Sequence, residues 1–231
     1  MDNRNHHKNQ KGIWAVIPVK RFDQAKKRLS PLLNADERRQ LSRVMLGDVL
    51  SAVSQSRHLS GIVVVTCNRE AMEMAHAHGA EVLAEDASHG LCEAVASAGQ
   101  YLKSRGCAGM ISIPGDVPLV SSDDIDHVIL SHGTAPAVTL VPAWDGGGTN
   151  VLVCTPADVI ELHFGENSFS AHKAAADKAG LSPKAMSSPS LELDLDTPND
   201  LYAFLERGSH TNTARYLNSI IQAPELKRGL G

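Results

Sequence analysis

Residues 110–119 read MISIPGDVPL. The first four residues form a short apolar run typical of a buried strand, and Pro114 and Gly115 end it directly before Asp116. Residues 121–130 have the pattern of a helix, with Ser121 as its N-cap and acidic residues in the first turn. A strand, a short loop and a helix make up the repeating unit of α/β proteins.

The same unit recurs on both sides of this stretch. Strands are expected at 13–19, 62–66 and 81–84, and helices at 36–56, 70–78 and 91–103. The order then changes, because a strand at 137–142 returns through the glycine-rich loop 145–150 as a second strand at 151–155. Such a return predicts an antiparallel excursion from a mostly parallel sheet. The remaining expected elements are a helix at 168–179, a strand at 191–195 and helices at 198–207 and 213–221.

These elements predict an α/β protein with three layers, α/β/α, around a mostly parallel sheet. With 231 residues and no internal repeat or long linker, one domain at 13–207 is the simplest organisation. Residues 1–12 are expected to form a disordered N-terminal arm, and 208–231 a partly helical C-terminal tail. The tail would pack either on the domain or on a second subunit, which makes a homodimer possible. Ligands of such sheets bind beyond the carboxyl ends of the strands.

Composition excludes several classes of function. A net charge of −4 and only 4% aromatic residues argue against nucleic-acid binding. Membrane association is not expected, because no apolar run approaches the roughly 20 residues of a spanning helix. The polar N-terminus lacks the apolar core of a signal peptide. The four cysteines, at 67, 92, 107 and 154, contain no CxxC pair, so buried free thiols in a reducing, cytoplasmic setting are expected.

Carboxylates follow two of the expected strands. Asp116 stands directly after a buried strand, where a hard oxygen ligand suits Mg²⁺ bound to phosphates. Residues 191–198 read LELDLDTP, and in a strand Asp194 and Asp196 would share one face with Glu192. A divalent cation would relieve the repulsion between them. The alternatives are a turn-capping Asp116, an exposed acidic strand edge, and a helix N-cap at Asp196.

A basic loop follows the first strand. Lys20 and Arg28, at its two ends, are candidates for holding phosphates, the lysine as a point charge and the arginine as a fork. A solvated basic turn is the alternative. The chain contains neither a GxxxxGK[ST] loop nor a GxGxxG loop, so the two commonest nucleotide fingerprints are absent.

Two further loops favour binding of a small acidic molecule. Residues 145–150 read DGGGTN and residues 164–169 read FGENSF. Consecutive glycines allow close approach to a ligand, and the start of a helix is a natural anion site. Candidate binding residues are therefore Gly147, Gly148, Thr149, Asn150, Gly165 and Ser168. Taken alone, each loop could be an ordinary turn without a ligand. His172, in the helix that follows, is expected to pack in the interior or to be solvated and not to catalyse.

The chain resembles the guanylyltransferases of deazaflavin coenzyme F(420) biosynthesis, in which GTP activates a phosphorylated three-carbon acid. The stretches that carry the resemblance are PVKRFDQAKKRL (18–29), ADERRQLSRVMLGDVL (35–50), GDVPL (115–119), DGGGTN (145–150), FGENSFSAH (164–172) and LDLDTPNDL (193–201). GDVPL alone fits many nucleotidyltransferases, but the combination is specific.

The resemblance implies a nucleotide-diphospho-sugar transferase-like fold of the glycosyltransferase-A type. It implies that Asp116, Asp194 and Asp196 bind Mg²⁺, that Thr149, Gly165 and Ser168 hold the acid, and that Lys20 and Arg28 lie along the nucleotide phosphates. It also places Pro18 and Gly90 on the nucleotide side, and makes Asp116, Lys20 and Arg28 the catalytic set. The partners would be GTP and 2-phospho-L-lactate, phosphoenolpyruvate or 3-phospho-D-glycerate.

Two departures from the family pattern stand out. Cys92 replaces the usual asparagine, which puts an amide contact to the nucleotide in doubt, and residues 216–231 extend beyond the usual end of the family. Two alternatives stay open. One is another nucleotidyltransferase, of nucleotide-sugar or molybdenum-cofactor type, although its LAGGxSxR-like loop is missing; the other is a non-catalytic nucleotide-binding module.

Overall fold

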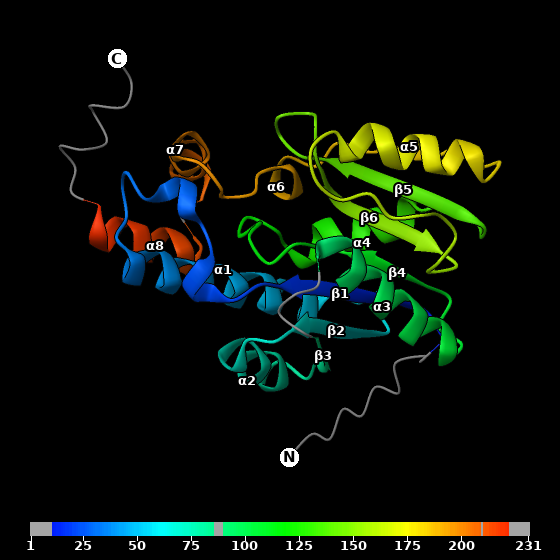
Figure 1. Cartoon of the computed structure of the whole chain (residues 1–231), viewed down its shortest axis with the longest axis horizontal. Helices are drawn as coiled ribbons and strands as arrows, with labels where there is room; N and C mark the ends of the chain where they lie inside the picture. The colour runs from blue at the N-terminus through cyan, green and yellow to red at the C-terminus, as the bar shows by residue number, and fades with distance from the viewer. Residues whose placement is uncertain (1–10, 86–89, 209, 222–231) are drawn as a thin grey trace.

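A seven-stranded sheet forms the centre of the protein (Figure 1). The computed structural model describes residues 11–85, 90–208 and 210–221. The strands follow the spatial order β3-β2-β1-β4-β6-β5-β7. Their bounds are β1 (Ile13–Val19), β2 (Gly61–Thr66), β3 (Glu81–Ala84), β4 (Gly109–Ser112), β5 (Ala137–Pro142), β6 (Thr149–Thr155) and β7 (Lys184–Ala185). Only β6 runs antiparallel to its neighbours, β4 and β5, which confirms the predicted excursion.

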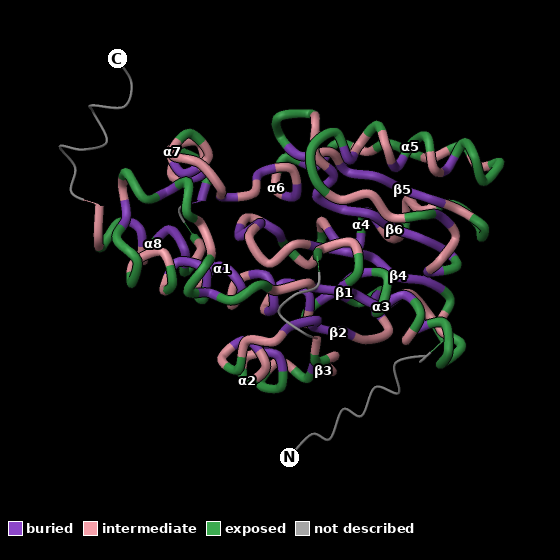
Figure 2. The backbone as a smooth tube through the Cα atoms, in the orientation of Figure 1, coloured by how far each residue is buried: buried purple, intermediate pink, exposed green. Residues whose placement is uncertain are grey.

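Helices cover both faces of the sheet. On one face lie α1 (Ala35–Gln55), α2 (Arg69–Ala77) and α4 (Ser122–Ser131), and on the other α3 (Leu91–Ser104) and α5 (Ser168–Lys178). Strand β1 serves both cores, because Ala15 and Ile17 point to the first face while Trp14 and Val16 point to the second. Figure 2 shows the central strands buried between the two helical layers. The predicted three-layer α/β/α architecture is confirmed.

A third core joins the C-terminal helices to α1. It packs Leu41 and Met45 of α1 against α7 (Pro198–Arg207) and α8 (Asn212–Ile220). The Asp48 carboxylate accepts hydrogen bonds from the backbone N–H groups of Asn212 and Thr213, at 3.2 and 2.8 Å, and so caps α8. Packing therefore continues to Ile221, beyond the boundary expected at 207. Helix α8 thus packs on α1 of its own chain. The homodimer stays a prediction.

The strand predicted at 191–195 is wrong. Pro189 begins a short helix, α6 (Pro189–Glu192), and the Glu192 side chain turns back to accept hydrogen bonds from Ser187 and Ser188. The alternation of buried leucines in this stretch is real, but Leu191 packs in the first core while Leu193 and Leu195 pack in the third. The segment crosses between two cores instead of pairing in the sheet.

Smaller differences also separate expectation from structure. The basic loop contains two short 3-10 helices, η1 (Phe22–Gln24) and η2 (Lys27–Leu29), and β7 was not anticipated. Lys11 and Gly12, placed in the expected arm, accept backbone hydrogen bonds from Ala108. All four cysteines are free, as expected, but only Cys154 is buried. The rest of the expected arm (1–10) and the end of the tail (222–231) lie outside the described residues. No helix among the described residues is long and apolar enough to cross a membrane.

Candidate active site

Three of the four predicted nucleotide residues, Pro18, Lys20 and Gly90, line one cavity. It has a volume of about 680 Å³ and lies beyond the carboxyl ends of the parallel strands β1 and β4. Residues from several separate stretches line it, including Pro18, Lys20, Lys26, Gly90, Asp116 and Asp196. Lys20 is exposed at this cavity and forms no ion pair with any residue that the structure describes. The cavity position agrees with the location expected for ligands of such sheets.

Asp116 is fixed at the end of β4. The Asp116 carbonyl accepts a 3.0 Å hydrogen bond from the backbone N–H of Leu195. That bond fastens the 193–196 segment, which carries the other two aspartates, to the strand end. Asp116 therefore lies near Asp194 and Asp196, the two aspartates that the resemblance groups with it, although the strand predicted for them does not form; binding of Mg²⁺ stays a prediction.

Lys26 lies among the aspartates and was not singled out by the sequence analysis. Its Nζ is 2.5 Å from an Asp116 oxygen and 3.7 Å from an Asp196 oxygen, and only 7% of its side chain is exposed. Burial alone would lower the pKa of Lys26, but the negative charges of the neighbouring carboxylates outweigh burial and raise it. Lys26 is thus a buried permanent cation at the cavity wall.

The basic run gives only a weak signal for Lys26. Phe22 and Leu29, on either side, are both buried and pull the loop onto the domain. The backbone of Lys26 itself takes a left-handed conformation, with φ of 54°, which aims its side chain inward. Arg28, which was predicted to hold phosphates, instead donates to Asp196 at 3.0 Å, has a side chain that is 70% exposed, and is not among the residues lining the cavity.

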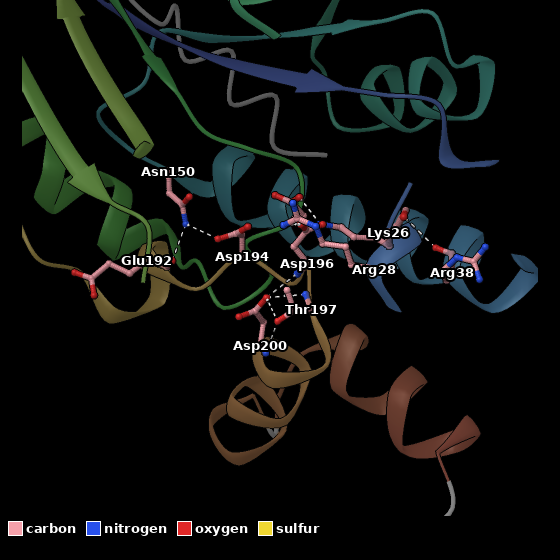
Figure 3. A network of polar contacts seen from close by, with 11 residues as sticks. Lys26, Arg28, Arg38, Asn150, Glu192, Asp194, Asp196, Thr197 and Asp200 are labelled. Atoms are coloured by element: carbon pink, nitrogen blue, oxygen red, sulfur yellow. Dashed lines mark hydrogen bonds and ion pairs between the residues drawn. The ribbon is translucent and has the colours of Figure 1, made fainter. Parts of the chain in front are cut away.

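Asp194 is partly buried, is not among the described residues that line the cavity, and points toward Asn150 (Figure 3). Burial, and then the nearby charge of Asp116, raises the pKa of Asp194 to about 6. The Asn150 amide donates to Asp194 at 3.2 Å and also to the carbonyls of Leu191 and Glu192. Two earlier expectations are corrected here: the Glu192 carboxylate faces Ser187 and Ser188 instead of the aspartates, and Thr197, not Asp196, caps α7.

The three carboxylates match the donor chemistry of Mg²⁺ only in part. They are hard oxygen donors, and burial together with the charge of Asp116 raises the pKa of Asp194. Within the described residues, however, no three acidic, imidazole or thiol groups converge as a ready-made metal cluster. Mg²⁺ commonly uses one or two carboxylates and completes its shell with substrate phosphates and water. Asp116 and Asp196, which line the cavity, fit that mode of binding.

The two loops predicted to bind an acid do lie together. The N–H of Thr149 donates to the Ser168 hydroxyl at 2.8 Å, and the N–H of Phe169 donates to the Gly147 carbonyl at 3.1 Å. Antiparallel β6 begins at Thr149, so its first residues lie at the same edge of the sheet as the carboxyl end of β4. Asn150 then connects this loop pair to Asp194, and the two halves of the site form one network.

Gly147 and Gly148 already have an anionic partner inside the protein. Their N–H groups donate to the Asp145 carboxylate at 2.9 and 3.3 Å. In this loop only Gly146 has a left-handed φ, of 75°, and in the second loop Gly165 has a φ of 127°. The side-chain groups that remain to meet a ligand anion are therefore the hydroxyls of Thr149 and Ser168, since the first two N–H groups of α5 already donate to the carbonyls of Gly165 and Gly147. That helix has no side-chain cap and no acidic residue in its first turn.

His172 and Cys92 support the second loop. The buried His172 ring contacts the Thr149 hydroxyl and the backbone N–H of His163, which confirms that it packs. Cys92 is the second residue of α3, and its sulfur accepts a 3.0 Å hydrogen bond from the N–H of Phe164. Cys92 is not among the described residues that line the nucleotide cavity. Its replacement of the family's asparagine therefore affects the acid side of the site in this structure.

Comparisons with known proteins identify the family of the chain. Residues 13–229 match the family described as guanylyl transferase CofC like. The phosphoenolpyruvate guanylyltransferase of Conexibacter woesei is 34% identical over 90% of this chain and 96% of its own length. The 2-phospho-L-lactate guanylyltransferase of Methanothermobacter thermautotrophicus is 34% identical over 93% of this chain and 94% of its own length. The 3-phospho-D-glycerate guanylyltransferase of Colwellia psychrerythraea is 32% identical over 80% of this chain and 88% of its own length.

Solved structures support the fold. A protein assigned as a nucleotide-diphospho-sugar transferase from Desulfovibrio desulfuricans G20 superposes with a TM-score of 0.74 at 17% identity, covering 95% of this chain and 97% of its own. A nucleotidyl transferase from Methanothermobacter thermautotrophicus superposes with a TM-score of 0.60 at 16% sequence identity. The match covers 90% of this chain and 98% of that protein. The predicted nucleotidyltransferase fold is confirmed.

One feature of the resemblance needs correction. Residues 216–231 were described as an extension beyond the family, yet the family match continues to residue 229. The tail that packs on α1 is thus part of the shared sequence pattern. The match spans residues 13–229, and the chain therefore belongs to the guanylyl transferase family described as CofC like.

Proposed function

We propose that the protein is a guanylyltransferase that joins the guanylyl group of GTP to a phosphorylated three-carbon acid and releases pyrophosphate. The product is a guanosine-diphosphate-linked acid of coenzyme F(420) biosynthesis. The three relatives named above carry phosphoenolpyruvate, 2-phospho-L-lactate and 3-phospho-D-glycerate in their names at 34, 34 and 32% identity. This chain is close to all of them, so sequence identity does not choose among the acids.

One observation carries the proposal. A cavity wall with a buried lysine and two aspartates lies beside a third aspartate, Asp194, which Asn150 joins to a loop pair that presents the hydroxyls of Thr149 and Ser168. The first half suits a triphosphate with a divalent cation, and the second suits a small acid. Two polyanionic substrates can thus bind side by side, which is what a group transfer between them requires.

The reaction needs little activation of the nucleophile. A phosphate monoester loses its second proton near pH 6, so the acid's phosphate is already largely dianionic at neutral pH. One of its oxygens attacks the α-phosphorus of GTP in line. A new P–O bond forms while the bond to the β-phosphate oxygen breaks, and pyrophosphate leaves. No general base and no covalent enzyme intermediate are required.

The chain's own residues supply charge and alignment. Lys26 places a fixed positive charge at the cavity wall, and Lys20 adds a mobile one beside the same cavity. Asp116 and Asp196 would hold Mg²⁺, with Asp194 nearby, and the ion would offset the negative charge that accumulates during transfer. Thr149 and Ser168 would hold the acid against the attack line.

The setting follows from the substrates. GTP and the small acid are metabolites of the cytoplasm, and four unpaired cysteines agree with a reducing compartment. We therefore place the reaction in the cytoplasm, with no nucleic-acid or membrane partner.

Pyrophosphate release measures the proposal directly. The purified protein is incubated with GTP, Mg²⁺ and each of the three acids in turn, with ATP and CTP as nucleotide controls. Rapid release with GTP and one acid is the expected result, together with a product of the corresponding mass. Binding of GTP without release for any acid would favour a nucleotide-binding module, and release with a sugar phosphate would favour a nucleotide-sugar enzyme.

A further inference from the structure

His172 lies between the two loops of the acid half, and its hydrogen bonds fix its tautomer. Its Nε2 atom is 3.0 Å from the backbone N–H of His163. A backbone N–H can only donate, so Nε2 accepts and carries no proton. The ring is fully buried beside Phe164, whose ring meets it edge-on at 5.0 Å. A neutral imidazole in this position has its proton on Nδ1.

The proton on Nδ1 sets the direction of the next hydrogen bond. Nδ1 is 3.0 Å from the Thr149 hydroxyl oxygen, so the imidazole donates and the hydroxyl accepts. Burial, and then the neighbouring His163, lowers the pKa of His172 to about 4, which keeps the ring neutral at neutral pH. His172 therefore uses the Thr149 oxygen as an acceptor and leaves the hydroxyl proton unused.

Ser168 is held in the same way. Its hydroxyl oxygen accepts from the N–H of Thr149 at 2.8 Å. Among the residues that the structure describes, no hydrogen bond takes the hydroxyl proton of either Thr149 or Ser168. Two neighbouring hydroxyls that already accept are left as a pair of donors, which is the pattern that recognises a carboxylate or phosphate oxygen.

We propose that His172 is a positioning residue that turns Thr149 into a hydrogen-bond donor toward the acid substrate. The imidazole supplies the donor that occupies the Thr149 oxygen, and the threonine proton is thereby directed at the anion. His172 touches neither substrate and acts through Thr149. This proposal rests on the proposed function, because it assumes that the loop pair holds the acid.

Two substitutions separate the two sides of the imidazole. In His172→Asn the amide nitrogen takes the place of Nδ1 and still donates to Thr149, while the bond from His163 is lost. In His172→Gln the amide oxygen takes the place of Nε2 and still accepts from His163, while the donor to Thr149 is lost. We expect His172→Gln to raise the KM for the acid about tenfold, the loss of one hydrogen bond to a charged group, and His172→Asn to raise it less than threefold. The KM for GTP stays unchanged in both.

Thr149→Val supplies the coupling test. It should raise the acid KM by about the same factor, Thr149→Ser should restore it, and His172→Gln should add nothing to it in the Thr149→Val background. A purely structural histidine gives the opposite pattern: equal effects of His172→Gln and His172→Asn, adding fully to that of Thr149→Val. Either of those results would overturn the proposal, as would a Thr149→Val enzyme with an unchanged acid KM.

His132 is a matched control. Its imidazole is partly buried, whereas that of His172 is fully buried, and its two ring nitrogens lie 2.8 Å from the hydroxyls of Thr139 and Thr155, at the other end of β5 and β6. His132→Gln should lower the melting temperature without changing the acid KM, whereas an equal rise of the acid KM in this variant would contradict the proposal. Failure of the proposed function looks different, because the unsubstituted protein would then release no pyrophosphate with any of the three acids.

Discussion

The two halves of the site prepare for anionic substrates in different ways. In the nucleotide half, full charges face one another: Lys26 lies against Asp116 and Asp196, with Asp194 nearby. In the acid half, the partners are a neutral imidazole, two hydroxyls and backbone N–H groups. When a triphosphate binds, Lys26 must exchange some of its contacts with the aspartates for contacts with phosphate. The hydroxyls of Thr149 and Ser168 are already held in place before an acid binds. Substitutions should therefore affect catalysis most in the first half and acid affinity most in the second.

The strongest way to break the charged half is Asp116→Asn. The change removes the carboxylate nearest Lys26 and one of the two oxygen donors at the cavity wall that suit Mg²⁺. We expect kcat to fall about a thousandfold while the protein stays folded, since the amide has nearly the same shape. Pyrophosphate release at saturating Mg²⁺ and circular dichroism measure the two effects. More than a tenth of the original activity would show that Asp116 does not bind the ion.

Lys26→Met tests the cation of the same half. Loss of the buried charge leaves three carboxylates without their common counter-ion, and we expect kcat to fall about a hundredfold with a higher KM for GTP. Lys27→Met is the matched control, because the neighbouring lysine is exposed. Equal losses in the two variants would mean that the general basicity of the loop matters and the placement of Lys26 does not.

The acid half should respond to pH through His172. Its folded pKa, about 4, lies below the ordinary value of 6.5, so the unfolded chain binds the proton more readily. The stability that depends on the neutral ring is present above pH 6.5 and is lost as the pH falls toward 4, by up to about 3 kcal/mol. Melting temperatures of the parent protein and His172→Gln between pH 7.5 and 4.5 should converge as the pH falls. If the melting temperatures of the two proteins instead fell in parallel with pH, the protonation of His172 would not contribute to the pH dependence of stability.

The smallest expected effect belongs to Cys92. Its sulfur orients Phe164 at the start of the second loop, so Cys92→Ala should raise the acid KM about threefold and leave the GTP KM unchanged. Kinetics with each substrate varied in turn make the comparison. A change confined to GTP would move Cys92 to the nucleotide half and contradict the structural assignment.

Much of the fold follows from local patterns. The run IVVV at 62–65 in β2 is apolar without a break and lies between Gly61 and Thr66, and such a short β-branched run predicts a strand buried on both faces. LELDL has an equally regular period of two, yet it forms no strand, because alternation reports two environments and does not report a pairing partner. Its leucines serve two different cores, and only the assembled structure reveals the second.

The site divides in the same manner. Asp116, Lys20 and Gly90 were predictable because they follow strand ends or open a helix, and the sheet gathers such positions at one edge. Lys26 was not, because a run of three basic residues carries no sign of which side chain turns inward; a left-handed backbone between two buried anchors decides it. The role of His172 depends on a backbone N–H from another segment, which no sequence pattern records.

The contact between α8 and α1 has a consequence for synthesis on the ribosome. Asp48 belongs to one of the first elements to be made, but the helix that it caps is among the last. Until residues near 220 emerge, the α1 surface around Leu41 and Met45 has no cover from α8, however early the sheet has formed. The nascent chain thus carries an apolar surface through most of its translation, and we expect a stop codon before α8 to be more harmful than the small size of that helix implies.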